Sequence, residues 1–420
     1  MLLLMRRPRL LYLTSAFPYG RGDTFFGPEA RELVRQGVDL RVIPMRPRGL
    51  LTVADAKTWT VRKPLLDLAI ARAALIETVR SPRTVASALR LLLRRPEPDV
   101  LVRNLAAFPK ALWIAHEARR WGADHIHAHW AGPPSTAALV ASRISGVPWS
   151  FTAHFADIAA NNLLEEKSAS AAFCRFIARS MMELARQTAP KCDESRWVLL
   201  HLGVDVSETY RIPGELNSPA VLLTAARFDV EKRHGTLVEA TRRLVDEGFD
   251  VQVWLAGAGP LKEQVERQVH GRGLEHVIRF LGFVMPEQLL EWLSTGLIDL
   301  VVLPSDAEGI PVSLMEALSH GIPAVACDAG GVTELLGDGC GEVVPIGDPD
   351  ALASAIAGLL SSPERRASLA QRGRERMERE FAVEPLVEQL RDLLGFGAGA
   401  EAADAQPAAA RHADSSATGL

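Results

Sequence analysis

The chain has 420 residues, of which 48% are apolar, and its formal net charge at neutral pH is -4. A chain of this length exceeds what one compact core usually organises, so we expect two domains of about 200 residues each. The nearly balanced charge gives no argument for nucleic acid or another polyanionic partner. The sequence has four cysteines, which show neither close pairing nor metal-ligand spacing: Cys174, Cys192, Cys327 and Cys340. This lack of a pattern favours a reducing compartment.

The first segment, MLLLMRRPRLLYLTSAF, has apolar runs of only about four residues, which are too short for a secretory signal or a membrane-spanning helix. We therefore expect a cytoplasmic protein. The run LLYLTSAF has the length of a strand. It is followed by a glycine loop and by PEARELVRQG, where Pro28 suits a helix start and Gly37 a helix end. The run VDLRVIPM supplies the next strand, so this part predicts a strand, loop and helix unit.

The loop between that strand and helix contains Gly20, Gly22 and Gly27. A dinucleotide-binding fingerprint needs a third glycine two positions earlier and an acidic residue at the end of the next strand. Both are missing here, which argues against a nicotinamide cofactor. Gly22 remains a candidate for a loop whose amides approach a ligand, and the alternative is an ordinary turn between strand and helix.

The region from residue 62 to residue 120 is basic, with twelve Lys or Arg against five acids, a net charge of 12 - 5 = +7. Segments such as TVASALRLLLRR are typical of basic amphipathic helices, which lie on anionic membrane surfaces or face acidic acceptors. The alternative interpretation is a solvated helical face on a globular domain.

Three histidines alternate in ADHIHAHWAGPP, at His125, His127 and His129. Strand spacing would place all three on one side, where three imidazoles could hold zinc. No acid or thiol is positioned by spacing to complete a zinc site, so we favour polar groups that line the cleft end of a strand. His154 follows another apolar run, with Asp157 three residues later. A histidine at the carboxyl end of a strand in a parallel sheet lies where ligands bind, unless it is a core histidine with its hydrogen bonds satisfied.

The half of the chain after Pro219 repeats the pattern of short apolar runs separated by helical segments. Such alternation predicts a parallel sheet with helices on both faces. The segment GVDVSETYRIPGELNSPA marks a linker between the two halves, because it is rich in turn-forming residues. From Gly397 the chain has little large apolar surface to bury, which predicts a disordered tail. The expected strands are AVLLTAARF, VQVWLAGAG, VIRFLGF, IDLVVLP, AVACD and GEVV.

The segment EGIPVSLMEALSHGIP has a carboxylate on either side of an expected helix start, at Glu308 and Glu316. Pro311 suits the first turn and Gly321 the stop, so we predict a helix from Pro311 to His320. Its free amides and dipole favour a phosphate. Acids beside a phosphate site are reasonable if the ligand is a nucleotide sugar. Glu316 would then accept hydrogen bonds from ribose hydroxyls and Glu308 from sugar hydroxyls.

Two cations that could neutralise the diphosphate occur in AARFDVEKRHG. Arg227 follows an apolar strand and Lys232 comes five residues later, so both can reach a site at the strand ends. Taken alone, such a pair is usually a solvated ion cluster. Beside a helix end that binds an anion, the pair supports a diphosphate site.

These residues resemble the retaining nucleotide-sugar glycosyltransferases of the GT-B fold, glycosyltransferase family 4, also called group 1. The resemblance extends to about Leu394, and its most specific part runs from Glu308 to Glu316 and on through HGIPAVACDAGGVTELL. The segments LAGAGP and FLGFV support it. The segments FPYGRGDTFFGPEARELVRQG, IHAHWAGPPSTAALVASRISGVPWSFTAHFADI and HLGVDV are similar to the subgroup that builds bacterial exopolysaccharide, including colanic acid-type transferases.

The resemblance implies an α/β protein with two facing Rossmann-like parallel-sheet domains and a cleft between them. The expected parts are an acceptor-binding domain (1–205), a linker (206–219), a donor-binding domain (220–380), a helix that crosses back to the first domain (381–395) and a disordered tail (396–420).

The resemblance also implies roles for individual residues. His154 would lie beside the reacting centre and Glu308 would hold the transferred sugar, so these two are the catalytic candidates. The candidates for donor binding are Arg227, Lys232, Gly259, Gly309, Ile310, Val312 and Glu316. The candidates for the acceptor side of the cleft are Gly22, His129 and Asp157.

The implied activity is transfer of a hexose-type sugar, with retained anomeric configuration, from a UDP- or GDP-sugar to a glycan or lipid-linked saccharide. The diphosphate would depart from the front face, with one of its oxygens helping to take the acceptor proton. No cofactor and no metal are expected, and the protein would be cytoplasmic, with peripheral contact to the inner face of the cell membrane as an option. The rival interpretations are a nucleotide-sugar 2-epimerase and a non-catalytic scaffold that binds nucleotide sugars in a polysaccharide assembly complex.

Overall fold

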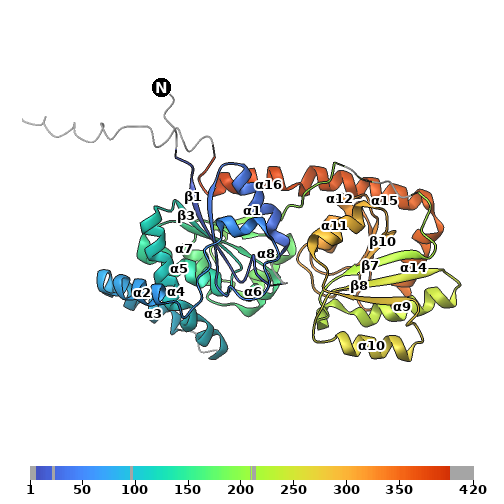
Figure 1. Ribbon diagram of the computed structural model, residues 1–420, viewed down its shortest axis with the longest axis horizontal. Helices are drawn as coiled ribbons and strands as arrows, with labels where there is room; N and C mark the ends of the chain where they lie inside the picture. The colour runs from blue at the N-terminus through green and yellow to red at the C-terminus, as the bar shows by residue number, and fades with distance from the viewer. Residues whose placement is uncertain (1–5, 21–23, 95–97, 209, 211–213, 398–420) are drawn as a thin grey trace, which may run out of the picture.

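The structure is a computed structural model that describes residues 6–20, 24–94, 98–208, 210 and 214–397. These residues form two six-stranded sheets, each covered by helices and each built from one half of the chain (Figure 1). Every strand pairing is parallel, as the alternation of short apolar runs with helical segments predicts. Of the predicted disordered tail, residues 398–420 lie outside the described residues, as does the candidate Gly22, whereas Phe396 is buried and belongs to a core cluster.

The N-terminal sheet has the strand order β2-β1-β3-β4-β5-β6. Its strands are β1 (Arg9–Thr14), β2 (Asp39–Pro44), β3 (His125–His129), β4 (Trp149–Ala153), β5 (Cys174–Phe176) and β6 (Trp197–Leu199). The helices of this half are η1 (Thr24–Phe26), α1 (Gly27–Arg35), η2 (Asp55–Trp59), α2 (Leu68–Arg80), α3 (Pro82–Leu92), α4 (Pro98–Trp121), α5 (Pro133–Ser145), α6 (Phe155–Ala160), α7 (Leu164–Ser170), α8 (Arg179–Thr188) and η3 (Glu194–Arg196).

The C-terminal sheet has the order β12-β11-β10-β7-β8-β9. Its strands are β7 (Ala220–Ala225), β8 (Val251–Ala256), β9 (Ile278–Gly282), β10 (Leu300–Leu303), β11 (Ala324–Cys327) and β12 (Glu342–Val344). The helices of this half are η4 (Val230–Lys232), α9 (His234–Asp246), α10 (Lys262–Gly271), α11 (Pro286–Ser294), α12 (Val312–Ser319), α13 (Val332–Leu336), α14 (Pro349–Ser361), α15 (Pro363–Arg376), η5 (Met377–Phe381) and α16 (Val383–Leu393).

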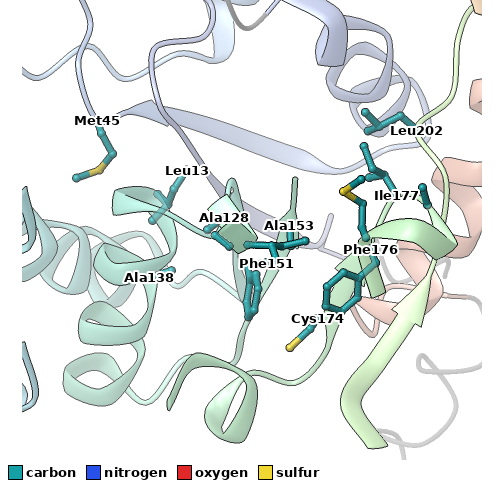
Figure 2. Close-up of a cluster of buried hydrophobic side chains, with 14 of the residues drawn as sticks. Leu13, Met45, Ala128, Ala138, Phe151, Ala153, Cys174, Phe176, Ile177 and Leu202 are labelled. Atoms are coloured by element: carbon teal, nitrogen blue, oxygen red, sulfur yellow. The ribbon is translucent and has the colours of Figure 1, made fainter. Parts of the chain in front are cut away.

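The two faces of the N-terminal sheet have different chemistry. Because side chains alternate along a strand, Leu13 and Ala128 point into an apolar core while Tyr12 points to the opposite face. Figure 2 shows the apolar face, where Leu13, Ala128, Phe151 and other side chains of neighbouring strands gather beside α5. The opposite face packs against α1 and α16 and is lined with buried polar side chains. These include Thr14, His125, His127, His129, Ser150, Thr152 and Arg175.

Helix α16 lies on the N-terminal domain although it follows the C-terminal one (Figure 1). Its residues Leu386 and Leu390 belong to the same buried cluster as Leu10 and Tyr12 of β1. A short parallel bridge joins Val204 to the residue that precedes the helix. Helix α16 therefore ties the C-terminal half to the polar face of the first sheet.

One acidic side chain connects the two domains directly. Glu334 of α13 accepts a hydrogen bond from the backbone N–H of Arg179, at 2.8 Å, and its carboxylate lies 3.6 Å from Nε2 of His201. Apolar contact continues the connection, because Ile177 and Leu202 share a buried cluster with Ile310 and Leu314. These contacts hold the carboxyl ends of the two sheets toward each other.

The basic region between residues 62 and 120 differs from its predicted arrangement in two ways. The apolar face of the TVASALRLLLRR segment, which forms most of α3, is buried in the domain core, so this helix cannot lay it on a membrane. Lys110 is also buried, and its ammonium donates to the backbone carbonyls of Pro44, Met45 and Lys63. Within the described part of the chain, no helix combines the length and the apolar character needed to cross a bilayer.

Candidate active site

Two adjoining pockets lie between the carboxyl ends of the two sheets, with volumes of about 700 Å³ and about 620 Å³. They share Phe25 from the N-terminal domain and Arg227, Lys232, Glu308 and Pro311 from the C-terminal domain. The larger one, here called the donor pocket, also contains Arg31, Asp205, Glu316 and His320. The smaller one, here called the histidine pocket, also contains Trp130, His154, Phe155 and Ile177. Because the pockets share a wall, they form one continuous cleft.

The two predicted cations come together at the shared wall. Lys232 donates to Glu308, with Nζ 2.7 Å from Oε1, and both side chains are largely buried. Arg227 is 65% exposed and pairs with Asp229, and its guanidinium lies 3.6 Å from the carboxylate of Glu231. The lysine is therefore fixed in place, whereas the arginine can reorient toward an anion in the cleft.

Glycines of the LAGAGP loop shape the backbone around Arg227. A Cβ atom at Gly257 would lie 1.9 Å from the carbonyl oxygen of Ala226, and one at Gly259 would lie 2.6 Å from that of Phe228. Gly259, predicted to bind the donor, does not line either of these pockets. It acts instead by letting the loop after β8 pass close to the loop that carries Arg227.

A second pair of glycines supports Glu308 and was not singled out from the sequence. A Cβ at Gly330, where φ is +56°, would lie 1.9 Å from the carbonyl oxygen of Glu308. The N–H of Gly331 donates to the carbonyl oxygen of Gly309 at 2.8 Å, and a Cβ at Gly331 would clash with that oxygen. The sequence shows these two glycines as the Gly-Gly dipeptide of DAGGVTELL, but only the fold shows that they pack against the backbone of Glu308 and Gly309.

The predicted anion-binding helix is α12, which is one residue shorter at each end than the predicted span. Pro311 is its N-cap, because the backbone of this residue is extended rather than helical, and His320 is its C-cap. No side chain caps its first turn, and Val312 lines both pockets. Gly309 and Ile310 lie just before the helix and form part of the wall of the histidine pocket. The first amides of α12 are thus available at the cleft.

Glu316 lies one turn into α12 and faces the donor pocket. Burial, and to a lesser extent the nearby carboxylate of Asp205, raise the pKa of its carboxyl to about 7. Asp205 itself pairs with Arg31, at 3.2 Å. Among the described residues no ion pair to Glu316 is seen, so the pocket holds a carboxyl group that would gain from hydroxyl donors.

His154 follows β4, serves as the N-cap of α6 and lines the histidine pocket. Its ring lies 4.3 Å from that of Trp130 and 5.8 Å from that of Phe25, centre to centre. Its Nε2 atom lies 2.8 Å from Nε2 of His129. Burial, and to a lesser extent the charge of Arg175, lower the pKa of His154 to about 3, so its imidazole is neutral.

The predictions for the other polar residues of the N-terminal half need correction. His125 and His127 lie along β3 rather than at its end, and they contact Ser150 instead of the cleft. His129 is at the strand end, but it is fully buried behind His154 rather than lining a pocket. Asp157 accepts a hydrogen bond from the backbone N–H of Ala131 at 3.0 Å, so it holds the loop after β3.

The zinc alternative for the three histidines also has no support in the geometry. No cluster of three or more His, Cys, Asp or Glu side chains suited to a metal ion occurs among the described residues. The ring nitrogens of His125 and His127 face the hydroxyls of Ser150 and Thr152. Hydrogen bonding within the sheet therefore accounts for these histidines.

Two aromatic residues of the cleft were not predicted as site residues from the sequence. Trp130 has a positive φ of 96°, which is rare for a bulky residue, and its ring packs on His154. Phe25 belongs to the short helix η1 and lines both pockets. Their signal was the position of each beside a predicted motif, Trp130 in IHAHWAG and Phe25 after the glycine loop.

Comparison with known proteins agrees with this geometry. Residues 206–376 match the family model described as Glycosyl transferases group 1. The chain is 27% identical over 256 residues to the amylovoran biosynthesis glycosyltransferase AmsK of Erwinia amylovora. The aligned residues make up 57% of this chain and 62% of that relative. It is 30% identical over 214 residues to the putative colanic acid biosynthesis glycosyltransferase WcaL of Escherichia coli K12, which covers 48% of this chain and 52% of that relative. The chain thus spans 52% to 62% of the length of these two relatives.

Solved structures resemble the chain over nearly its whole length. Anabaena HepE in complex with UDP-glucose has a TM-score of 0.69 at 16% identity, over 92% of this chain and 99% of that one. Sucrose-phosphate synthase from Thermosynechococcus elongatus has a TM-score of 0.71 at 18% identity, over 92% and 98%. The chain therefore has the GT-B fold. Its residues 206–376 are similar to glycosyl transferases group 1, and the chain resembles exopolysaccharide glycosyltransferases.

The raised pKa of Glu316 predicts a pH-dependent cost of folding. Between its ordinary value of 4.5 and about 7, the folded protein keeps a proton that the unfolded chain has lost. Stability of the wild type should therefore fall as pH rises through this window, by on the order of 1 to 3 kcal/mol relative to Glu316→Gln. Urea unfolding of both proteins at pH 5 and pH 8 measures the difference. Asp205→Asn should show a smaller fall than the wild type, and parallel curves for all three proteins would contradict the prediction.

Proposed function

We propose that the protein is a retaining glycosyltransferase that moves a hexose-type sugar from a UDP- or GDP-sugar to a glycan or lipid-linked saccharide in exopolysaccharide biosynthesis. The observation that carries this proposal is the cleft wall where Arg227, Lys232 and the start of α12 meet between Glu308 and Glu316. Fixed positive charge flanked by two carboxyls suits a diphosphate with hydroxyl-bearing groups at both ends. The named relatives, which are glycosyltransferases of exopolysaccharide pathways, support the same class of reaction.

In this proposal the ligand lies along the shared wall of the two pockets. The diphosphate would contact the first amides of α12 and the side chains of Lys232 and Arg227. The ribose would extend into the donor pocket toward Glu316. The sugar would lie at the junction with the histidine pocket, between Glu308 on one side and His154 on the other.

In the ion pair of Lys232 with Glu308, the lysine would stabilise the charge of the leaving phosphate and the glutamate would position the sugar. A diphosphate gains negative charge on its leaving oxygen as the glycosidic bond breaks, and Lys232 lies at hydrogen-bond distance from Glu308 at that place. Glu308 accepts from the lysine through one oxygen and keeps lone pairs for a sugar hydroxyl. Rate enhancement would then come from positioning the reactants and from stabilising the departing phosphate, with the acceptor on the same face as the leaving group.

Within the basic region from residue 62 to residue 120, the membrane contact is proposed for α2 rather than for the TVASALRLLLRR segment. Helix α2 carries an outward stripe of Leu68, Leu75 and Val79, which are 86%, 66% and 73% exposed. Arg72 lies within this stripe and Arg80 at its end, and both are exposed. Exposed apolar residues bordered by arginines suit the surface of an anionic bilayer, where a lipid-linked acceptor would be found.

The first test separates the roles of the two acids. Glu316→Ala should weaken binding of UDP or GDP by about 1 to 3 kcal/mol, since the ribose hydroxyls lose the carboxyl group that accepts their hydrogen bonds. Glu308→Gln should leave nucleotide affinity nearly unchanged but lower the rate of sugar transfer. Calorimetry with UDP and GDP, together with a transfer assay on both sugar nucleotides, measures these effects. Equal losses of nucleotide affinity in both variants would contradict the assignment.

The same assay separates the proposal from its two rivals. A 2-epimerase would convert the donor without an acceptor and release an epimeric sugar, whereas a scaffold would bind the donor and leave it intact. Transfer with retained configuration, seen by NMR of the product, is the outcome that the proposal requires.

A second test asks how the diphosphate charge is met. Because Lys232, Arg227 and the start of α12 supply positive charge at the cleft, transfer should proceed at an unchanged rate in excess EDTA. Lys232→Ala should lower the rate about 100-fold or more, and magnesium should not restore it. Initial rates for both proteins with EDTA, with magnesium and with neither give the answer. Loss of wild-type activity in EDTA that magnesium reverses would show that a metal carries this charge.

A third test concerns α2. The variant Arg72→Ala/Arg80→Ala should bind vesicles rich in anionic lipid about 30-fold more weakly, since each basic contact is worth about 1 kcal/mol near the surface. The matched control Arg267→Ala/Arg279→Ala removes two exposed arginines of the other domain and should bind like the wild type. Binding should also fall with added salt. Equal binding of the wild type to neutral and anionic vesicles in a sedimentation assay would remove the membrane from the proposal.

A further inference from the structure

We propose that a buried chain of side chains, running from Arg175 through Glu29, Tyr12 and His129, sets the tautomer of His154, so that its Nδ1 faces the cleft as a hydrogen-bond acceptor. Tyr12 and His129 are then positioning residues that act through His154. The consequence for catalysis rests on the proposed function, whereas the order of the protons depends only on this row of hydrogen-bonded side chains.

The chain crosses the polar face of the N-terminal sheet without a gap. Nη1 of Arg175 lies 2.5 Å from Oε2 of Glu29, and the hydroxyl of Tyr12 lies 2.6 Å from Oε1 of the same carboxylate. The tyrosine oxygen lies 2.7 Å from Nδ1 of His129, whose Nε2 lies 2.8 Å from Nε2 of His154. All five side chains are buried, and His154 is the one of these five that lines the cleft pockets formed by the described residues.

The sheet itself brings these residues into line. Tyr12, His129, His154 and Arg175 come from β1, from the ends of β3 and β4, and from β5, which are consecutive in the sheet. Alternation places all of them on the face that packs against α1, the helix that carries Glu29.

The direction of every hydrogen bond follows from the arginine end. The guanidinium of Arg175 is always charged, and its other recorded bonds go to the neutral carbonyls of Leu200 and His201. A buried cation without a counter-ion is strongly destabilising, so Glu29 is its carboxylate partner and can only accept. The single hydroxyl proton of Tyr12 therefore points to Glu29, and burial together with that carboxylate raises the pKa of Tyr12, which keeps the proton in place.

The next two steps follow by elimination. With its proton committed to Glu29, Tyr12 can only accept from His129, so His129 carries its proton on Nδ1. Burial lowers the pKa of His129 well below its ordinary value, so its Nε2 is unprotonated and accepts from His154. His154 then carries its single proton on Nε2, and its Nδ1 has a free lone pair.

That lone pair discriminates between parts of the proposed ligand. Nδ1 of a neutral imidazole accepts from a hydroxyl and repels a phosphate oxygen, whereas the opposite tautomer would donate to the phosphate. Lys232 and Arg227 lie in the same pocket and attract the diphosphate. His154 in the tautomer set by the chain would thus select a sugar hydroxyl and leave the diphosphate to the cations.

Spectroscopy tests the order of the protons without any need for activity. In protein labelled with ring-15N histidine, two-bond 1H–15N correlations should show His154 protonated on Nε2 and His129 on Nδ1. His154→Gln and His129→Gln assign the signals among the eleven histidines. In Tyr12→Phe, His129 loses the acceptor for its Nδ1 proton, so both neutral tautomers of His129 and His154 should appear. A wild-type His154 protonated on Nδ1, or a spectrum that Tyr12→Phe leaves unchanged, would overturn the proposal.

Kinetics test the consequence. Tyr12→Phe should lower kcat about 10- to 100-fold, the cost of one hydrogen bond in the transition state, with an unchanged KM for the sugar nucleotide and unchanged affinity for the free nucleotide. Tyr210→Phe is the matched control, because it removes a tyrosine hydroxyl that is not part of the hydrogen-bonded row from Arg175 to His154. A rise in KM with no change in kcat would overturn the role of the chain in catalysis.

A second pair of variants covers a Tyr12→Phe protein that fails to fold. The amide of His129→Gln can donate to Tyr12 and accept from His154, so it keeps the direction of the chain and should retain much of kcat. His129→Leu breaks the chain and should not. Equal kcat in both variants would contradict the proposal. A wild type that shows the expected tautomers but no sugar transfer would instead refute the proposed function alone.

Discussion

The ion pair between Lys232 and Glu308 is the contact on which the arrangement of the cleft depends. It joins the loop after β7 to the loop after β10 at the place where the two pockets share a wall. A largely buried lysine and glutamate are costly to desolvate, and their mutual attraction offsets this cost only where they lie close together. Gly257 and Gly330 let other loops pack closely against the loops after β7 and β10, because a side chain at either position would collide with the carbonyl oxygen of Ala226 or Glu308. The charge pattern of the site is therefore built from backbone contacts.

The two domains contribute different kinds of chemistry to the cleft. The C-terminal domain supplies positive charge and helix amides that are fixed before any ligand arrives, which suits an anion. The N-terminal domain supplies a neutral, ordered hydrogen-bonding face whose last member, His154, reaches the cleft. Glu334 and α16 hold these surfaces opposite each other. Discrimination between phosphate and hydroxyl then follows from the contrast between the charged wall and the neutral one.

Much of the architecture was predictable because it depends on local pattern. Apolar runs of strand length with helical segments between them predict parallel sheets, and the strands and α12 lie close to their expected positions. Arg227, Lys232, Glu308 and Glu316 could be proposed from their position beside a strand or a helix start. The placement of the basic region was not predictable, because charge counted along the chain cannot show that Lys110 is buried or that the apolar face of α3 belongs to the core.

The sequence by itself determined which groups could act and on which edge of a sheet they would appear, since strand ends and helix starts are local features. Only the tertiary structure decided what those groups do to one another. The ordering of protons from Arg175 to His154 joins residues up to 146 positions apart, and each bond depends on distances of 2.5 to 2.8 Å that no spacing along the chain reveals. Its direction follows from the one permanently charged member, which the fold places at the buried end.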